Sequence, residues 1–481
     1  MSDTRGLLDR ISAFRQRLDA TPQLIPDAVL VESEPAQLPA EVEAFRQSVR
    51  LLAGVPPIVA EEPLPQFTDR AHRLLASAKQ FLDRQRAFTA DPLYAGVAST
   101  DPTDAIVLYH RETVAVLDSV VRLAQGFPDS PGAQLKLCEG LEGLLGVVRD
   151  RLTVQERTLQ RRKTEAARVD RLAAFFTNLQ AHQATVIQPV AAIAEELLEE
   201  ARQAKPIRLA RVGVRSTRAF PGAVEFPAPA RFIAAHAINV AQIIARVVPY
   251  DYEWASRPLL PVVTALIMDC GMLAMPAEML AKTEPLTPEE RRTLETHPKY
   301  GAELLLWRFP TLAGPLAAAV ATHHERSDGT GYPAALQGAD LPALGRLLRV
   351  ADVYAAMCED RPHRAALDPR AALTEILLLA EQGQLDRDFV EYLLNLSFYP
   401  AGTIVELTDG RVGVVVANHH NRLDSRTPGR PVVAVLADAG GVLLPHPEHI
   451  DLSTTERGSI LGGVPAARAC KLLGSRYPDL V

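Results

Sequence analysis

Residues 323–333 read HHERSDGTGYP, and the two histidines at the start of this segment constrain the fold around them. Adjacent residues point about 100° apart around a helix axis, so neighbouring histidines cannot share one helix face. The pair fits best at a helix end, where the backbone can aim both imidazoles inward. The glycines and the proline that follow predict a tight loop. The segment therefore predicts a helix that stops at a pair of inward-facing ligands.

Histidines and aspartates recur on both sides of this segment, among predicted helices between residues 230 and 395. Imidazoles together with a carboxylate that can bridge are the donors that two divalent metal ions require, with an open position for water. Core polar residues without a metal are the competing interpretation, which leaves an uncompensated polar cluster. The candidate ligands are His236, Asp269, His297, His323, His324 and Asp352.

The segment 323–333, with HPKYG before it and RLLRVADVYAAMCEDRPHR after it, resembles the HD-GYP family of metal-dependent cyclic di-GMP phosphodiesterases. The resemblance covers about residues 230–395. It implies an all-helical metal domain that hydrolyses a cyclic dinucleotide, most directly cyclic di-GMP, in a signalling protein. The implied cofactors are one or two divalent ions per chain, of the iron or manganese type.

Each implied role comes from a matching residue of the family. Asp269 is expected to bridge two ions, and Asp269 and Asp352 are the implied catalytic carboxylates. The first ion is expected at His236, Asp269 and Asp352, and the second at Asp269, His297, His323 and His324.

Two further groups of residues carry implied roles. Arg361 and Arg364 are expected to meet substrate phosphates, which suits the fixed bidentate fork of arginine. The signature loop Gly331-Tyr332-Pro333 is expected to be a structural and partner-binding element that ligates no metal.

The chain departs from the family beside Asp269. Where the family has a histidine before the aspartate and a lysine three residues after it, this sequence has Met268 and Met272. A thioether is a poor ligand for hard divalent ions. Three hypotheses stay open: an enzyme with impaired hydrolysis, a catalytically inactive regulator that binds nucleotide or protein, and hydrolysis of a different phosphoester. Cys270 is expected to pack in the core.

The rest of the chain predicts a mainly α protein of several domains. Pro-rich breaks between amphipathic segments predict a helical input region over 1–150. A tighter repeat predicts a long-helix or coiled-coil connector over 151–206, which relays a signal or forms a homodimer seam. The expected order is completed by a linker with a short strand (207–229), the metal domain (230–395), a small β-barrel-like module (400–455) whose Asp409-Gly410 is a hairpin signal, and a tail (456–481).

Composition and net charge exclude some classes of protein and of partner. The 481 residues carry 51 Lys and Arg against 58 Asp and Glu, a formal net charge of −7, and 47% are hydrophobic. This is the composition of a globular protein, and the acidic balance argues against nucleic acid as a partner. Four widely spaced cysteines, a charged amino terminus and short apolar stretches predict a cytoplasmic protein without a membrane span.

Overall fold

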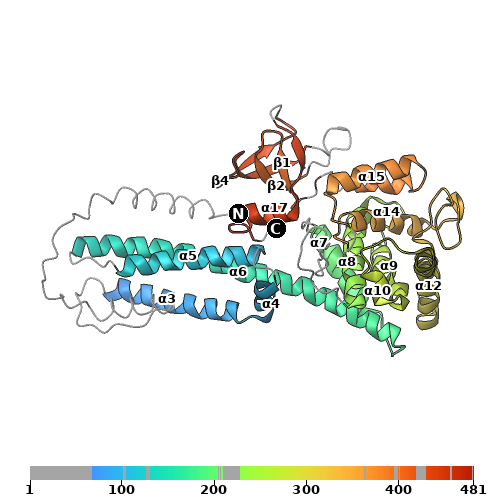
Figure 1. Ribbon diagram of the computed structural model, residues 1–481, viewed down its shortest axis with the longest axis horizontal. Helices are drawn as coiled ribbons and strands as arrows, with labels where there is room; N and C mark the ends of the chain where they lie inside the picture. Colours follow the sequence, from blue (N-terminus) through green and yellow to red (C-terminus); the bar gives the residue numbers. More distant parts are fainter. Residues whose placement is uncertain are drawn as a thin grey trace. The chain divides into compact units, whose positions relative to one another are not determined.

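The computed structural model describes residues 68–100, 104–125, 131–203, 205, 207–209, 228–311, 313–361, 364–394, 399, 401–418, 430–455, 458–478 and 480. They fall into two compact units. Unit 1 holds the described residues up to Lys163, with Leu436–Glu448 and the chain from Ala466, and unit 2 holds Thr164–Val435 and His449–Pro465. Most described residues are helical and one sheet lies near the carboxyl end (Figure 1), which confirms the mainly α class.

Unit 1 is built from helices whose apolar faces pack together. Leu74, Phe81 and Phe88 follow one another at seven-residue intervals on α3 and are all buried, as expected for one stripe of an amphipathic helix. The helices are α3 (Thr68–Thr89), α4 (Pro92–Thr100), α5 (Ala105–Gln125), the first part of α6 (Pro131–Gln180) and α17 (Ala466–Leu473). The predicted helices of the input region are therefore present where it is described, and residues 1–67 lie outside the described part.

The predicted connector is a long helix followed by a second one. Helix α6 ends at Gln180 and α7 (Gln188–Arg202) begins with a proline in its first turn, so the connector consists of two helices. The apolar stripe of α6 is buried in the core of unit 2, through Val169, Leu172, Phe176 and Leu179. These side chains are therefore not available as a homodimer seam, and that expectation is wrong for them.

Two carboxylates of α7, Glu196 and Glu200, share a buried partner on α6. Arg168 is buried and donates to Glu196 at 3.1 Å and to Glu200 at 2.8 Å. Both ion pairs join α6 to α7 within unit 2, and removing either acid would leave part of a buried guanidinium without its acceptor.

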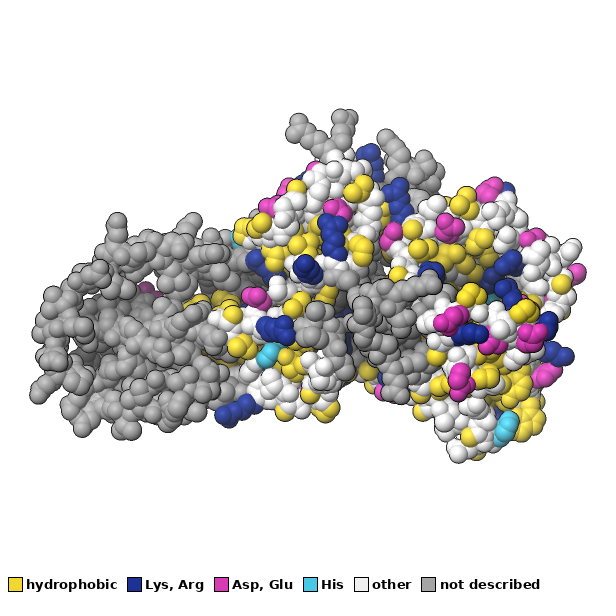
Figure 2. Space-filling view, viewed as in Figure 1, with side chains coloured by type: hydrophobic (Ala, Val, Ile, Leu, Met, Phe, Trp, Pro, Cys, Tyr) yellow, Lys and Arg dark blue, Asp and Glu magenta, His cyan; other side chains and the backbone are white. Residues whose placement is uncertain are grey.

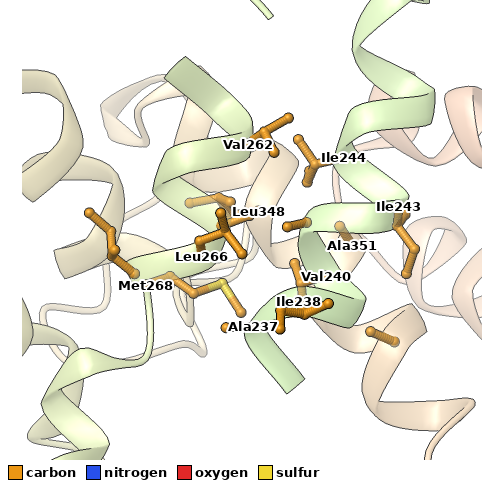
Figure 3. Packing of buried hydrophobic residues seen from close by; sticks show 14 of the residues in the cluster. Ala237, Ile238, Val240, Ile243, Ile244, Val262, Leu266, Met268, Leu348 and Ala351 are labelled. Atoms are coloured by element: carbon orange, nitrogen blue, oxygen red, sulfur yellow. The ribbon is translucent and has the colours of Figure 1, made fainter. Parts of the chain in front are cut away.

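The helices that follow form the core of unit 2. Helix α8 (Pro229–Val247) packs against α7, α9 (Leu259–Ile267) and α14 (Ala343–Met357), and Figure 3 shows their aliphatic side chains meeting. The other helices are α10 (Ala277–Leu280), α11 (Pro288–Leu294), α12 (His297–Arg308), α13 (Ala313–Thr322), α15 (Pro369–Glu381) and α16 (Arg387–Leu394), with 3₁₀ turns η1 (Val248–Tyr250), η2 (Cys270–Ala274) and η3 (Gly338–Asp340). Thr287 and Glu290 form a capping box at the start of α11.

One described segment, Pro229–Tyr250, is long and apolar enough to cross a membrane by length and composition. Its apolar window is 83% buried inside the protein. A helix that is apolar on all sides and surrounded by other helices is a central helix of a protein core. Figure 2 shows Lys and Arg side chains among Asp and Glu side chains on the face of the described residues that it draws.

The sheet is antiparallel, with strand order β4-β3-β2-β1-β5. Its strands are β1 (Ile404–Leu407), β2 (Val412–Ala417), β3 (Val432–Ala437), β4 (Leu443–Asp451) and β5 (Ile460–Gly463). Asp409-Gly410 joins β1 to β2 as predicted, and Gly410 has φ +84°, a conformation that favours glycine.

Two expectations need correction here. The segment 456–481, expected to be a tail, contains β5 and α17, because β5 completes the sheet by pairing with the free edge of β1. Residues 207–209 of the predicted short strand are not in a strand, and its remainder lies outside the described residues.

Candidate metal centre

Six candidate ligands from five places in the chain meet at one end of the helical core. His236 lies on α8 and Asp352 on α14, whereas Asp269 follows α9 and His297 opens α12. His323 and His324 come directly after Thr322, the last residue of α13, which confirms the predicted helix end.

Contacts between these side chains run continuously through the cluster. The Nε2 of His236 lies 2.9 Å from Asp352 Oδ1 and 3.7 Å from Asp269 Oδ2. On the other side, Asp269 Oδ1 lies 3.3 Å from His297 Nε2 and 3.4 Å from His323 Nε2. Asp269 therefore lies between the two groups of ligands, in the position that the expected bridging role requires.

The half of the cluster with the most imidazoles has donors suited to a divalent ion. One ligand atom from each of Asp269, His297, His323 and His324 lies within 4.8 Å of the others. The Nδ1 of His297 is 2.7 Å from Leu294 O, and the Nδ1 of His323 is 2.6 Å from Val320 O. Since a carbonyl oxygen only accepts, each Nδ1 carries a proton, and a ring without a second proton turns a lone pair on Nε2 toward Asp269.

These lone pairs explain why the cluster suits a metal. The two Nε2 atoms of His297 and His323 are 3.4 Å apart and both face the same carboxylate. With both rings neutral, no proton lies between these acceptors, so a cation is the partner that satisfies them. The cluster is a candidate divalent-metal site.

The other half of the cluster contains a carboxylate that the sequence analysis did not assign. Glu359 lies 2.9 Å from Nδ1 of His236, and Asn239 donates to it at 2.7 Å. Burial opposes the charged form of His236, yet the negative charge of Glu359 and the hydrogen bonds to Asp352 and Glu359 raise its pKa to about 10. The only sequence feature that could have identified Glu359 is its position two residues before Arg361.

Arg349 is a second residue that the sequence analysis missed. It lies on α14 three residues before Asp352, a spacing that places both on one helix face. Its Nη1 is 3.1 Å from His324 Nδ1 and 3.4 Å from Asp352 Oδ2. A basic residue one turn before a candidate metal ligand is the signal that could have identified it.

The two methionines beside Asp269 differ in position. Met268 is fully buried in the apolar core, and Figure 3 shows it beside Ala237 and Ile238 of α8. Met272 is half-buried and lines a pocket next to the ligands. Cys270 is fully buried, as predicted, and burial raises the pKa of its thiol.

The pocket has a volume of about 620 Å³ and opens beside the ligand cluster. Its lining includes Met272, Tyr332, Arg349, Arg361 and Arg364. The lining therefore combines several apolar side chains, one aromatic ring and three guanidinium groups with the metal ligands, a set suited to an anionic ligand that carries rings.

The expected phosphate-binding arginines both have protein partners. Arg361 donates to Glu359 at 2.9 Å and lies over the ring of Phe232. The guanidinium of Arg364 donates to the carbonyls of Ala356 and Met357, at 2.6 and 3.1 Å. These contacts hold both guanidinium groups at the pocket wall.

The signature loop lies against the cluster. The Tyr332 ring stacks on His324 with centroids 4.8 Å apart. At Gly331 a Cβ atom would lie 2.3 Å from the Arg326 nitrogen, so only glycine fits. The buried carboxylate of Glu325 accepts from the backbone N–H groups of Ala334 and Leu336, at 2.6 and 3.2 Å. The loop is thus held to the end of α13 beside the ligands.

Two family models match the chain. Residues 222–389 match a model described as an HD domain, and residues 404–462 match a KOW domain associated with HD domain.

Curated relatives match between 26% and 33% of the chain. A cyclic di-GMP phosphodiesterase of Pseudomonas aeruginosa is 34% identical over 160 residues, 33% of this chain and 38% of the relative. A cyclic di-GMP phosphodiesterase response regulator of Xanthomonas campestris pv. campestris is 37% identical over 132 residues, 27% of this chain and 34% of the relative.

A third relative has a different substrate in its name. It is a 3'3'-cGAMP-specific phosphodiesterase of Vibrio cholerae, 35% identical over 128 residues, 26% of this chain and 24% of the relative. The chain thus spans between 24% and 38% of the lengths of these three relatives. Residues 222–389 are therefore an HD domain, which holds the ligand cluster and the signature loop at one site.

Proposed function

We propose that this chain is a signalling protein whose HD-GYP domain hydrolyses a cyclic dinucleotide, cyclic di-GMP being the first candidate. The observation that carries the proposal is the buried cluster of Asp269, His297, His323 and His324 beside a pocket lined by arginines. Relatives named for cyclic di-GMP and for 3'3'-cGAMP support the substrate class. Hydrolysis is expected to be weakened by Met268 and Met272.

The metal is proposed to be iron or manganese, with one or two ions per chain. Bound divalent ions supply Lewis acidity and a water of lowered pKa. Within the chain, Leu294 and Val320 accept the Nδ1 protons of His297 and His323 and so keep their Nε2 lone pairs turned to the site. Asp269 offers an oxygen to each half of the cluster.

The substrate is proposed to lie in the pocket beside the ligands. Arg361 and Arg364 are held by their protein partners, so a phosphate meets donors that are already oriented. The ring of Tyr332 covers one side of His324 and offers an aromatic surface on the same wall. Together these side chains orient an anionic ligand and exclude part of the solvent from it.

Purified full-length protein loaded with Mn²⁺ or Fe²⁺ tests the proposal. Incubation with cyclic di-GMP, and separately with 3'3'-cGAMP, is expected to give a linear product that is absent from His324→Ala. His449→Ala is the matched control, because His449 is exposed on β4. A metal-loaded chain that yields no product from either nucleotide contradicts the enzyme and favours the alternative, an inactive regulator that binds nucleotide or protein.

Other expectations belong to the same proposal. A cytoplasmic location suits a protein that acts on an intracellular nucleotide, and the signature loop around Tyr332 is the proposed docking element for a signalling partner. The acidic net charge of −7 supports the expectation that nucleic acid is not a partner.

A further inference from the structure

A buried cation faces the candidate metal ligands from α14. The side chain of Arg349 is 17% exposed, and its Nη1 contacts His324 Nδ1 and Asp352 Oδ2 at 3.1 and 3.4 Å. Its Nε is buried and has no hydrogen-bond partner among the described residues. Arginine only donates and stays charged, so this guanidinium has donors to spare beside the ligand cluster.

The present contacts of Arg349 cannot all persist once a metal binds. His324 and Asp352 are both expected ligands, and a lone pair given to a metal is no longer an acceptor for the guanidinium. A bound divalent ion also repels a neighbouring cation in a buried site. An anion that contacts both cations removes this conflict, and a phosphate oxygen is the chemical group that does so at such sites.

The charges at the pocket wall also favour an anion beside Arg349. Met272, where the resemblance expects a lysine, lines the pocket with an apolar side chain, and Arg349 lines that pocket too. The positive charge missing from the segment after α9 is therefore supplied by a neighbouring helix.

We propose that Arg349 binds a phosphodiester group of the substrate and replaces the charge that is absent at Met272. The inference rests on the proposed function for the identity of the ligand, a cyclic dinucleotide. It adds a phosphate-binding residue, and Arg361 on the same pocket wall leaves a second guanidinium for the second phosphate.

Binding to the Mn²⁺-loaded full chain tests the proposal without turnover. The probe is the bisphosphorothioate analogue of cyclic di-GMP, measured by titration calorimetry, with manganese per chain determined in the same samples. Arg349→Ala is expected to weaken binding roughly 10- to 100-fold, and Arg349→Lys to recover part of it, because lysine keeps the charge but loses the fork. Arg387→Ala is the matched control, since Arg387 is 62% exposed on α16.

Two results of the titration with the analogue overturn the proposal. One is unchanged affinity of Arg349→Ala for the analogue, and the other is weaker binding that accompanies an equal loss of manganese, which would make Arg349 a support for the ligands. If Arg349→Ala fails to fold, Arg349→Gln keeps a planar polar group without the charge and answers the same question.

Inorganic phosphate gives a second readout that does not depend on the nucleotide. In the native chain phosphate is expected to tighten Mn²⁺ binding, and in Arg349→Ala this coupling is expected to disappear, because linkage is reciprocal. A native chain without the coupling overturns the proposal. Retained binding of the analogue without hydrolysis of cyclic di-GMP contradicts the proposed enzyme alone, and hydrolysis with a KM insensitive to Arg349→Ala contradicts the role of Arg349 alone.

Discussion

The carboxylate of Glu359 lies 2.9 Å from Nδ1 of His236, whereas Nε2 of the same ring lies 2.9 Å from Asp352. Glu359 also accepts from Asn239 and Arg361. A carboxylate on the outer nitrogen of an imidazole sets the tautomer and orientation of the ring when the inner nitrogen binds a metal. Glu359 therefore aims His236 at the half of the site that lacks the family's second histidine.

Glu359→Gln is expected to weaken the binding of the first metal by about 10- to 100-fold, because an amide holds the ring less firmly than a charged acceptor. Metal titration of the metal-free protein, followed by elemental analysis, measures this effect. Glu381→Gln is the control, since Glu381 is 70% exposed on α15. Equal metal affinity in native protein and Glu359→Gln would show that His236 is oriented by Asp352 alone.

Met272→Lys is expected to increase affinity for cyclic di-GMP, since the residue lines the pocket and the new ammonium can contact a phosphate there. A gain of roughly tenfold corresponds to one charge-assisted hydrogen bond. The bisphosphorothioate analogue again gives the dissociation constant. A loss of affinity would mean that the new cation repels Arg349 and does not add to it.

Met268→His, in contrast, is expected to lower stability. Met268 is fully buried among apolar side chains, and an imidazole without a partner there costs about 1–3 kcal/mol. Chemical denaturation of the metal-free variant measures this cost. Recovery of that stability on adding Mn²⁺ would instead show that the new ring has turned to the metal site, and a rise in hydrolysis would accompany it.

Gly331→Ala is expected to disturb the signature loop. The added Cβ would lie 2.3 Å from the Arg326 nitrogen and 2.5 Å from the Glu325 Cα, and the backbone has to shift by about 1 Å to relieve such overlaps, at roughly 1–3 kcal/mol. Lower Tm and loss of the stacking between Tyr332 and His324 follow. Gly314→Ala is the control, because nothing lies within 4 Å of its added Cβ. Equal Tm values for the two variants would contradict the steric argument.

The helices of unit 1 are expected to lose stability in mild acid. His110 packs against Phe88 and Tyr94, with ring centroids 5.5 and 5.2 Å away, and burial lowers its pKa below the ordinary 6.5. Its neutral form stabilises the fold fully above pH 6.5, and that contribution is lost as pH falls and the unfolded chain takes up the proton.

Hydrogen exchange in α3 and α5, corrected for the intrinsic rate, measures the effect between pH 8 and pH 5. His110→Gln removes the titrating group and is expected to flatten the pH dependence. A slope that persists in this variant would assign the effect to other groups.

Much of the site could be predicted from local sequence. The segment 323–333 predicts a helix end followed by a tight loop from its own residues, because two adjacent histidines followed by glycines and a proline fit that local structure. The Asp409-Gly410 turn and the capping box at Thr287 are equally local, since each depends on residues within a few positions.

The contacts that the sequence left undecided join residues far apart in the chain. Glu359 and His236 are 123 positions apart, and from the sequence alone the apolar stripe of α6 could equally have faced a second chain, whereas in the structure it is buried in the core of unit 2. The sequence by itself predicted the candidate ligands and that Met268 is not one of them. Only the tertiary structure decided that Met268 packs into the core while Arg349 and Glu359 reach the site, because side-chain direction depends on packing between helices that no local pattern encodes.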